Sequence, residues 1–273
     1  MTHLNSMKTF ISVRSDNAPV VAVAIHDGHA VRAEIADELA LTASERFREE
    51  DSFTGMWTEM APTRVIGLRS RFEVDLNRKR HRCVYLGPRD AWGLNVWKRE
   101  PDKELVEQSR LLYDEFYRHM FELLSDIQSR YGTFFVYDLH AYNHRRGGPG
   151  QPPAAAIDNP QINVCTGGMD LERCEPVVQA FVDSMQSFDF PGGMLDVRRN
   201  VRFRATRFSR WVHENFPRTG ISLGIEIKKF YMDEWTGELY PEVHSAIGNA
   251  LESTLHPILE RLPELEHRER KDI

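Results

Sequence analysis

Val20-Val21-Ala22-Val23-Ala24-Ile25 is a continuous apolar run that ends in the polar segment His26-Asp27-Gly28-His29. A short run rich in β-branched residues is typical of a strand buried on both faces, as in a parallel sheet. Open α/β sheets bind their ligands at the carboxyl ends of such strands. The segment therefore predicts an α/β fold, and it places two histidines where such a fold carries its chemistry.

Further strand signals alternate with helical patterns along the chain. Apolar runs predict strands at 63–68, 72–76, 134–139 and 221–227. Apolar residues spaced three, four and seven apart predict helices at 33–48, 101–130, 171–188 and 207–216, and from 241 onwards. The segment 144–153 is rich in Arg, Gly and Pro and is expected to be a mobile loop. This alternation favours a three-layer α/β/α fold with a twisted mixed sheet.

Length and composition predict one soluble domain that spans residues 1–273, with a charged C-terminal tail that frays from about residue 264. The net charge of −6 offers no basic footprint for nucleic acid. No apolar stretch approaches the roughly 20 residues of a membrane span. The three cysteines form no C-x-x-C pair, and residues 1–13 lack the apolar core of a signal peptide. A cytoplasmic enzyme is therefore expected, and its oligomeric state stays open.

Two histidines, His26 and His140, directly follow predicted strands. Neighbouring strand ends converge in space, so the pair favours a metal site, although a strand-end histidine can also simply bond to backbone. A catalytic zinc takes three protein ligands and keeps one position for water. Asp51, at the end of an acidic run, is the first choice for the third ligand, with Glu50 and His29 as alternatives. An acidic run is otherwise a solvated helix end.

Asp138 stands two residues before His140, and residues two apart share one face of a strand. Asp138 is therefore expected to support that histidine from behind or to sit beside the metal.

A polar cluster occupies the segment Arg-Phe-Glu-Val-Asp-Leu-Asn-Arg at 71–78. Arginine binds a planar carboxylate through two parallel hydrogen bonds, so Arg71 and Arg78 are candidates for holding an acidic substrate, together with Asn77. The alternative is a set of ion pairs at the strand end, in which Asp75 pairs with an arginine.

Glu226 lies inside the apolar run 221–227. Burial raises the pKa of a carboxylate, and a raised pKa suits a general base that works near neutral pH. The alternative is an outward-facing glutamate that pairs with Lys228 or Lys229.

These segments, in this order, resemble the N-formylglutamate amidohydrolase family over roughly residues 20–234. The resemblance is carried by Ile25-His26-Asp27-Gly28, by 71–78, by Asp138-Leu139-His140, and by Ile225-Glu226-Ile227 through 231–234. The family is related in fold to zinc carboxypeptidases and aspartoacylase, so the resemblance implies a zinc-exopeptidase-like fold.

The resemblance also implies roles for particular residues. The implied ligands of one Zn²⁺ are His26, Asp51 and His140; the implied substrate-binding residues are Arg71, Asn77 and Arg78; and the implied catalytic base is Glu226. The implied activity is zinc-dependent hydrolysis of the linear carboxamide bond of a small acidic N-acyl amino acid such as N-formylglutamate.

The chain departs from the family pattern in two places. Residues 200–207 replace a Lys-Gly-Gly-like stretch, and His29 stands where a small or apolar residue is commoner. These differences leave two alternatives open. One is a peptidase or other deacylase on the same scaffold, and the other is a non-enzymatic relative that binds a metal and a ligand.

Overall fold

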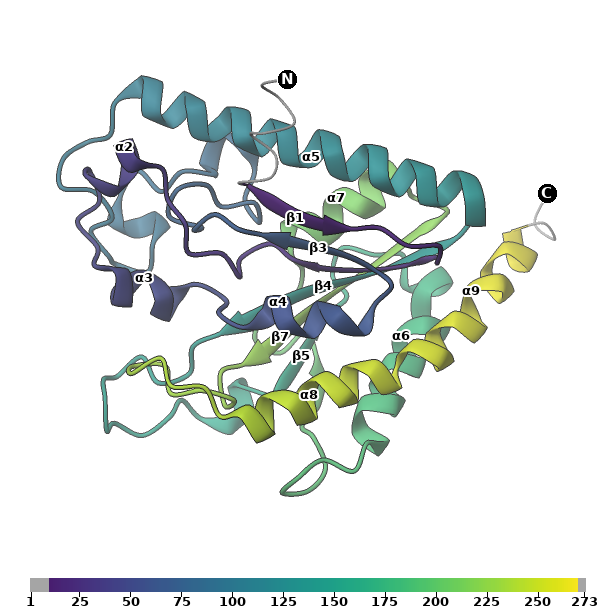
Figure 1. Ribbon diagram of the computed structural model, residues 1–273. Coiled ribbons are helices and arrows are strands. Elements are labelled where there is room, and N and C mark those ends of the chain that lie inside the picture. The colour runs from purple at the N-terminus through teal and green to yellow at the C-terminus, as the bar shows by residue number, and fades with distance from the viewer. Residues whose placement is uncertain (1–9, 270–273) are drawn as a thin grey trace.

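A mixed β-sheet lies at the centre of the computed structural model, which describes residues 10–269 (Figure 1). Within these residues seven strands follow the order β1-β3-β2-β4-β7-β5-β6. The strands are β1 Ile11–Arg14, β2 Val20–Ala24, β3 Thr63–Gly67, β4 Phe134–Tyr142, β5 Ile162–Cys165, β6 Val197–Arg199 and β7 Gly220–Lys228. The central strands β3, β2, β4 and β7 are parallel, whereas β1 and β5 run antiparallel to β3 and β7. The predicted mixed sheet is therefore confirmed.

Helices cover both faces of the sheet, which confirms the three-layer fold. On one face pack α5 Lys103–Tyr131 and α7 Arg207–Asn215; on the other pack α4 Thr54–Trp57, α6 Leu171–Ser187, α8 Pro241–Ser253 and α9 Leu255–Glu269 (Figure 1). Successive side chains of a strand point to opposite faces. Val21 and Val23 of β2 accordingly join the core beneath α5, and Val20 and Ala22 join the core beneath α8.

The helices predicted at 101–130, 171–188 and 207–216 are confirmed to within a few residues. The helix predicted from 241 onwards is instead two helices, α8 and α9, with Thr254 between them. α5 stops at Tyr131, and the next residue, Gly132, has a φ of 72° that glycine adopts without strain. α6 starts after Asp170, whose carboxylate accepts hydrogen bonds from the backbone N–H groups of the first turn. Among the described helices, none combines the length and the apolar character needed to cross a bilayer.

The helix predicted at 33–48 is wrong, because the chain forms two separate helices, α2 Ala33–Ala36 and α3 Ala43–Glu49. Thr42 starts the second helix through a capping box. Its side chain accepts from the backbone N–H of Glu45, and the Glu45 carboxylate accepts from the backbone N–H of Thr42.

The strand predicted at 72–76 is also wrong, because this segment is a turn. The backbone carbonyl of Ser70 accepts from the N–H groups of Glu73, at 2.9 Å, and Val74, at 3.2 Å. The short strands β1, β5 and β6 were not predicted. In the expected tail, the backbone stays helical as far as Glu269, and residues 270–273 lie outside the described part of the chain.

Candidate active site

A cavity of about 190 Å³ opens where β2, β4 and β7 end at one edge of the sheet. All seven residues that the sequence predicts for the site line this one cavity: His26, Asp51, Arg71, Asn77, Arg78, His140 and Glu226. They come from five separate parts of the chain. The volume lies below the roughly 300–1,000 Å³ of pockets for drug-sized ligands, so the cavity favours a small substrate.

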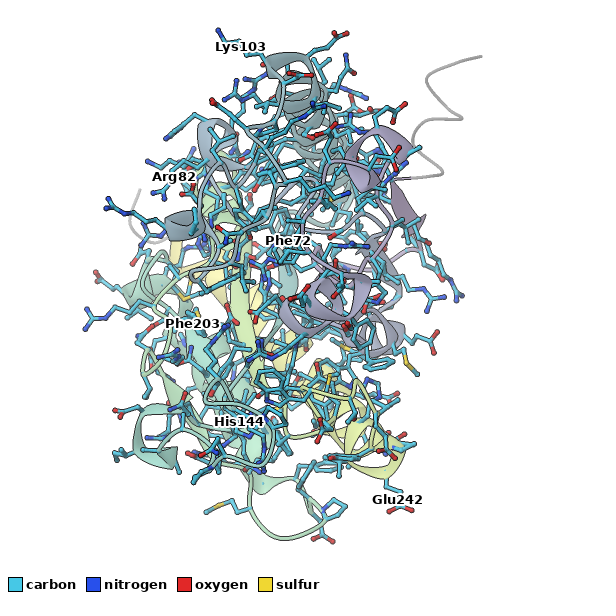
Figure 2. All side chains as sticks on the ribbon, turned by 90° about the vertical axis from the view of Figure 1, so that its left-hand side faces the viewer. Phe72, Arg82, Lys103, His144, Phe203 and Glu242 are labelled. Atoms are coloured by element: carbon cyan, nitrogen blue, oxygen red, sulfur yellow. The ribbon has the colours of Figure 1, made fainter. Side chains whose placement is uncertain are left out.

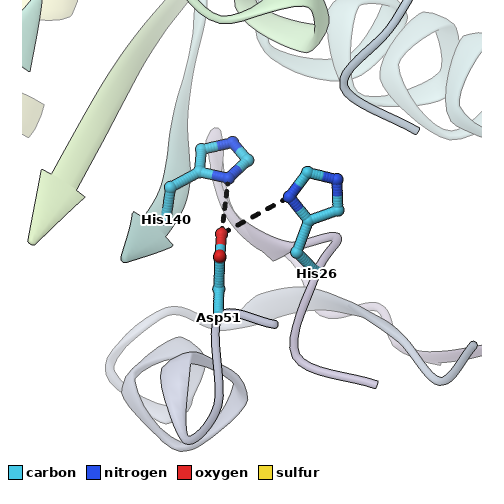
Figure 3. Close-up of side chains that lie close together, drawn as sticks. All are labelled: His26, Asp51 and His140. Carbon is cyan, nitrogen blue, oxygen red and sulfur yellow. Dashed lines mark hydrogen bonds and ion pairs between the residues drawn. The ribbon is translucent and has the colours of Figure 1, made fainter. Parts of the chain in front are cut away.

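Three of the lining residues, His26, Asp51 and His140, are buried and lie close together (Figure 3). The Nδ1 atoms of His140 and His26 lie 3.0 and 3.4 Å from one carboxylate oxygen of Asp51. One ligand atom from each residue lies within 4.8 Å of the others, a spacing that allows all three to contact one metal ion. His26 follows β2 and His140 lies in β4, its neighbour in the sheet, as the sequence predicts.

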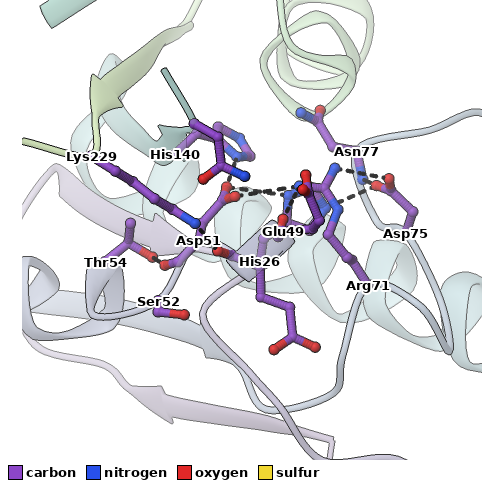
Figure 4. A network of polar contacts seen from close by, with 12 residues as sticks. His26, Glu49, Asp51, Ser52, Thr54, Arg71, Asp75, Asn77, His140 and Lys229 are labelled. Atoms are coloured by element: carbon purple, nitrogen blue, oxygen red, sulfur yellow. Dashed lines mark hydrogen bonds and ion pairs between the residues drawn. The ribbon is translucent and has the colours of Figure 1, made fainter. Parts of the chain in front are cut away.

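Each histidine is supported from behind by a buried carboxylate. His140 Nε2 donates to Asp138 at 2.9 Å, which confirms the expected contact between these residues. His26 Nε2 donates to Asp75 at 2.8 Å, a contact that the sequence did not reveal (Figure 4). Since a carboxylate accepts from each Nε2, a ring that carries its single proton on Nε2 turns its Nδ1 lone pair toward Asp51, as a metal ligand must.

This arrangement fits a bound cation. The Asp51 carboxylate and the two Nδ1 atoms that face it require a positive charge at this point, which either protons on the rings or a metal ion supplies. Burial raises the pKa of Asp51, but the hydrogen bond from His140 and the nearby His26 and Arg71 outweigh it and hold the pKa well below its usual range. His26 Nδ1 is buried and has no hydrogen-bond partner among the described residues. The donor set of two imidazoles and one carboxylate is one that catalytic zinc uses, with a fourth position left for water.

The alternative ligands lie elsewhere. His29 Nδ1 and a Glu50 carboxylate oxygen contact each other at 2.6 Å, and neither residue lines the cavity. Among the described residues, the group with metal-binding geometry is the one that contains Asp51.

The two predicted arginines differ in their surroundings. Arg71 donates to Asp51 at 3.3 Å and to Asp75 at 3.1 Å, so the ion pairs considered as the alternative do form around it (Figure 4). Arg78 is 30% exposed; its Nε lies 3.6 Å from Asp75, and one of its Nη atoms donates to the carbonyl of Asp90. The side-chain oxygen of Asn77 accepts two backbone N–H groups at the start of α7. Arg78 therefore has more donors available for a ligand than Arg71.

Glu226 lies beside His140 on neighbouring strands and is 8% exposed. Burial raises its pKa to about 8. The alternative ion pairs do not form in the described structure, because Lys228 donates to the carbonyl of Asn159 and Lys229 to those of Arg48 and Glu50. Glu226 is thus a buried carboxylate that faces the cavity.

Sequence reasoning missed two cations that line the cavity, Arg146 and Lys229. Arg146 comes from the loop after β4 and pairs with Glu49 at 2.8 Å. Burial lowers the pKa of Lys229 to about 8. The sequence of a loop has no periodicity that shows which way its side chains point. The one available signal for Arg146 was its position shortly after the end of a buried strand.

A buried His-Asp-His group and a nearby glutamate at the carboxyl ends of parallel strands define a hydrolytic type of site. A sequence model of the N-formylglutamate amidohydrolase family matches residues 18–232. The chain therefore belongs to the N-formylglutamate amidohydrolase family, as its motifs indicated.

Two solved structures share the fold. The crystal structure of an N-formylglutamate amidohydrolase from Ralstonia eutropha JMP134 superposes with a TM-score of 0.69 at 16% identity, covering 94% of this chain and 99% of that one. A gene product from Agrobacterium tumefaciens superposes with a TM-score of 0.66 at 16% identity, covering 93% and 96%. No curated protein sequence matches this chain.

Proposed function

We propose that this protein is a zinc-dependent amidohydrolase that cleaves N-formylglutamate to formate and glutamate. The observation that carries the proposal is the pair of histidine Nδ1 atoms aimed at Asp51, in a cavity that Arg78 and Glu226 also line. The match to the family supports amide hydrolysis. Substrate, metal and residue roles are inferred from the chemistry of the cavity.

The proposed ligands of the metal are His26, Asp51 and His140. A divalent ion such as zinc, when bound, supplies a Lewis acid that makes water more acidic and polarises an amide carbonyl. Asp75 and Asp138 hold the two rings in the tautomer that leaves Nδ1 unprotonated.

Glu226 is the proposed general base. It takes a proton from the attacking water and delivers that proton to the nitrogen of the departing glutamate. Its raised pKa suits both steps, because a group with a pKa near the working pH both accepts and releases protons readily.

Arg78 is the proposed anchor for a substrate carboxylate, with Asn77 and Arg71 beside it. Arg71 also carries a structural role, because it joins Asp51 and Asp75. A carboxylate held at Arg78 fixes where the amide lies relative to Glu226, and such positioning lowers the barrier to reaction.

The test is to measure formate release from N-formylglutamate by the purified protein, before and after a chelator removes metal, and again after zinc is added back. The proposal expects activity that is lost and then restored. A panel of N-acetylated amino acids and dipeptides run in parallel separates this function from that of another deacylase or a peptidase. Full activity after complete removal of metal contradicts the proposal.

A further inference from the structure

A second cavity adjoins the first and shares three lining residues with it, Asn77, Arg78 and Ala205. Its volume is about 380 Å³, compared with about 190 Å³ for the first. Because Arg78 lines both cavities, a ligand that contacts Arg78 from the first cavity has room to continue into the second.

The second cavity carries a concentration of positive charge. Among the described residues that line it, the basic side chains are Arg78, Lys79, Arg82, Arg207 and Arg210, and the one acidic side chain is Glu214. The whole chain has a net charge of −6, so this cluster runs against its overall composition. A cleft lined by one sign of charge attracts ligands of the opposite sign.

Only part of this charge is neutralised inside the protein. Arg207 pairs with Glu214 at 2.8 Å, and Arg82 pairs with Asp90 at 2.9 Å. Within residues 10–269, Lys79 and Arg210 form no ion pair. The stem of Arg210 packs against Gly168, where an added Cβ would fall 2.6 Å from Arg210 Cγ. Two cations at the second cavity thus lack an internal counter-charge.

We propose that the second cavity is a subsite for an anionic extension of the substrate. The favoured substrates are then N-acylated acidic amino acids that continue into a second acidic residue. This inference rests on the proposed function. Lys79 and Arg210 contact the carboxylate of the second residue, while cleavage takes place in the first cavity. Because these cations are exposed, their effect is modest, falls with added salt and lies in KM rather than kcat.

The test compares three kinds of substrate. They are N-formylglutamate, N-formyl-glutamyl-glutamate in its α- and γ-linked forms, and N-formyl-glutamyl-glutamine amide, whose extension is uncharged. The variant K79Q/R210Q removes the two unpaired cations. The variant R118Q/K103Q is a matched control, because it removes two exposed cations from α5. Figure 2 shows Lys103 at the top of the molecule, well away from Phe203, which lines the first cavity.

The wild type is expected to have a higher kcat/KM for an acidic extension, in at least one linkage, than for the uncharged one. K79Q/R210Q should lower kcat/KM for that acidic extension by about tenfold, mainly through KM, which corresponds to about 1.4 kcal/mol for two exposed charge contacts. Its kcat/KM for N-formylglutamate should stay unchanged, as should all values of the control variant.

The subsite is overturned if K79Q/R210Q lowers kcat/KM equally for all substrates. It is also overturned if the wild type has no higher kcat/KM for an acidic extension in either linkage. A protein that does not hydrolyse N-formylglutamate at all refutes the proposed function instead. In that case the subsite is tested by calorimetric titration of the protein with diglutamate. Binding that weakens in K79Q/R210Q but not in the control supports the subsite, and an absence of binding overturns it.

Discussion

Asp75→Asn should weaken zinc binding, because no orientation of an amide satisfies the partners of this buried carboxylate. One oxygen of Asp75 accepts from His26 Nε2 and the backbone N–H of Asn77, both at 2.8 Å; the other accepts from Arg71 at 3.1 Å and from the Tyr85 hydroxyl. An amide NH₂ must therefore face either His26 or Arg71. Facing His26, it favours the tautomer with a protonated Nδ1, which cannot bind metal. Facing Arg71, it leaves a buried charged donor unpaired, at a cost of about 1.5–3 kcal/mol.

The expected loss of zinc affinity is about 10–100-fold, the usual effect of removing a carboxylate behind a metal-binding histidine. The assay titrates the metal-free protein with zinc against a chromophoric chelator at neutral pH. Denaturant unfolding of the metal-free protein measures the stability cost separately.

Asp138→Asn is the matched control for this reasoning. One oxygen of Asp138 accepts from His140, but its other partners are the hydroxyls of Thr206 and Ser209. Hydroxyls rotate and can accept from an amide NH₂, which leaves the amide oxygen facing His140. Zinc affinity should therefore fall by only about threefold, below the usual effect of such a change. If Asp138→Asn loses as much affinity as Asp75→Asn, the argument from hydrogen-bond partners is refuted.

Three further outcomes are expected. Glu226→Gln should lower kcat by about 10²–10⁴-fold while metal content persists, and a near-normal kcat would remove Glu226 from the mechanism. Arg78→Lys should raise KM for N-formylglutamate by about tenfold, because lysine cannot form two parallel hydrogen bonds to a carboxylate; unchanged kinetics would make Arg78 structural. Burial lowers the pKa of His213 to about 4, and its neutral ring donates to the Gly168 carbonyl and accepts from the Ser222 N–H. An unfolded chain takes up this proton near pH 6.5, so unfolding becomes easier by up to about 3 kcal/mol as pH falls from about 6.5 to about 4. His213→Gln should remove that part of the pH dependence in denaturant titrations, and an unaltered profile would contradict the assignment.

The sequence predicts the elements that are long or buried on both faces. The strand before His26 and the strand that holds His140 are continuous apolar runs, and α5 shows a regular apolar stripe. His26 and His140, which follow or belong to these strands, reach the cavity together with Glu226, as predicted. The local sequence pattern is enough to predict these strands, because burial on both faces requires a continuous run of apolar residues.

The contacts of segment 71–78 could not be predicted from sequence pattern alone. The apolar residues Phe72, Val74 and Leu76 alternate as in a strand, but hydrogen bonds to Ser70 turn the chain instead. The turn brings Asp75 behind His26, a contact between residues 49 positions apart. Tertiary packing decided the conformation of this segment, and periodicity does not report such packing.

Metal analysis combined with turnover tests the central claim most directly. The wild type should bind one zinc ion per chain and release formate from N-formylglutamate. His140→Ala should bind no stoichiometric zinc and release no formate, while its circular dichroism spectrum stays that of a folded protein. A folded His140→Ala protein that still holds one zinc ion per chain, or that still releases formate at the wild-type rate, would contradict the account.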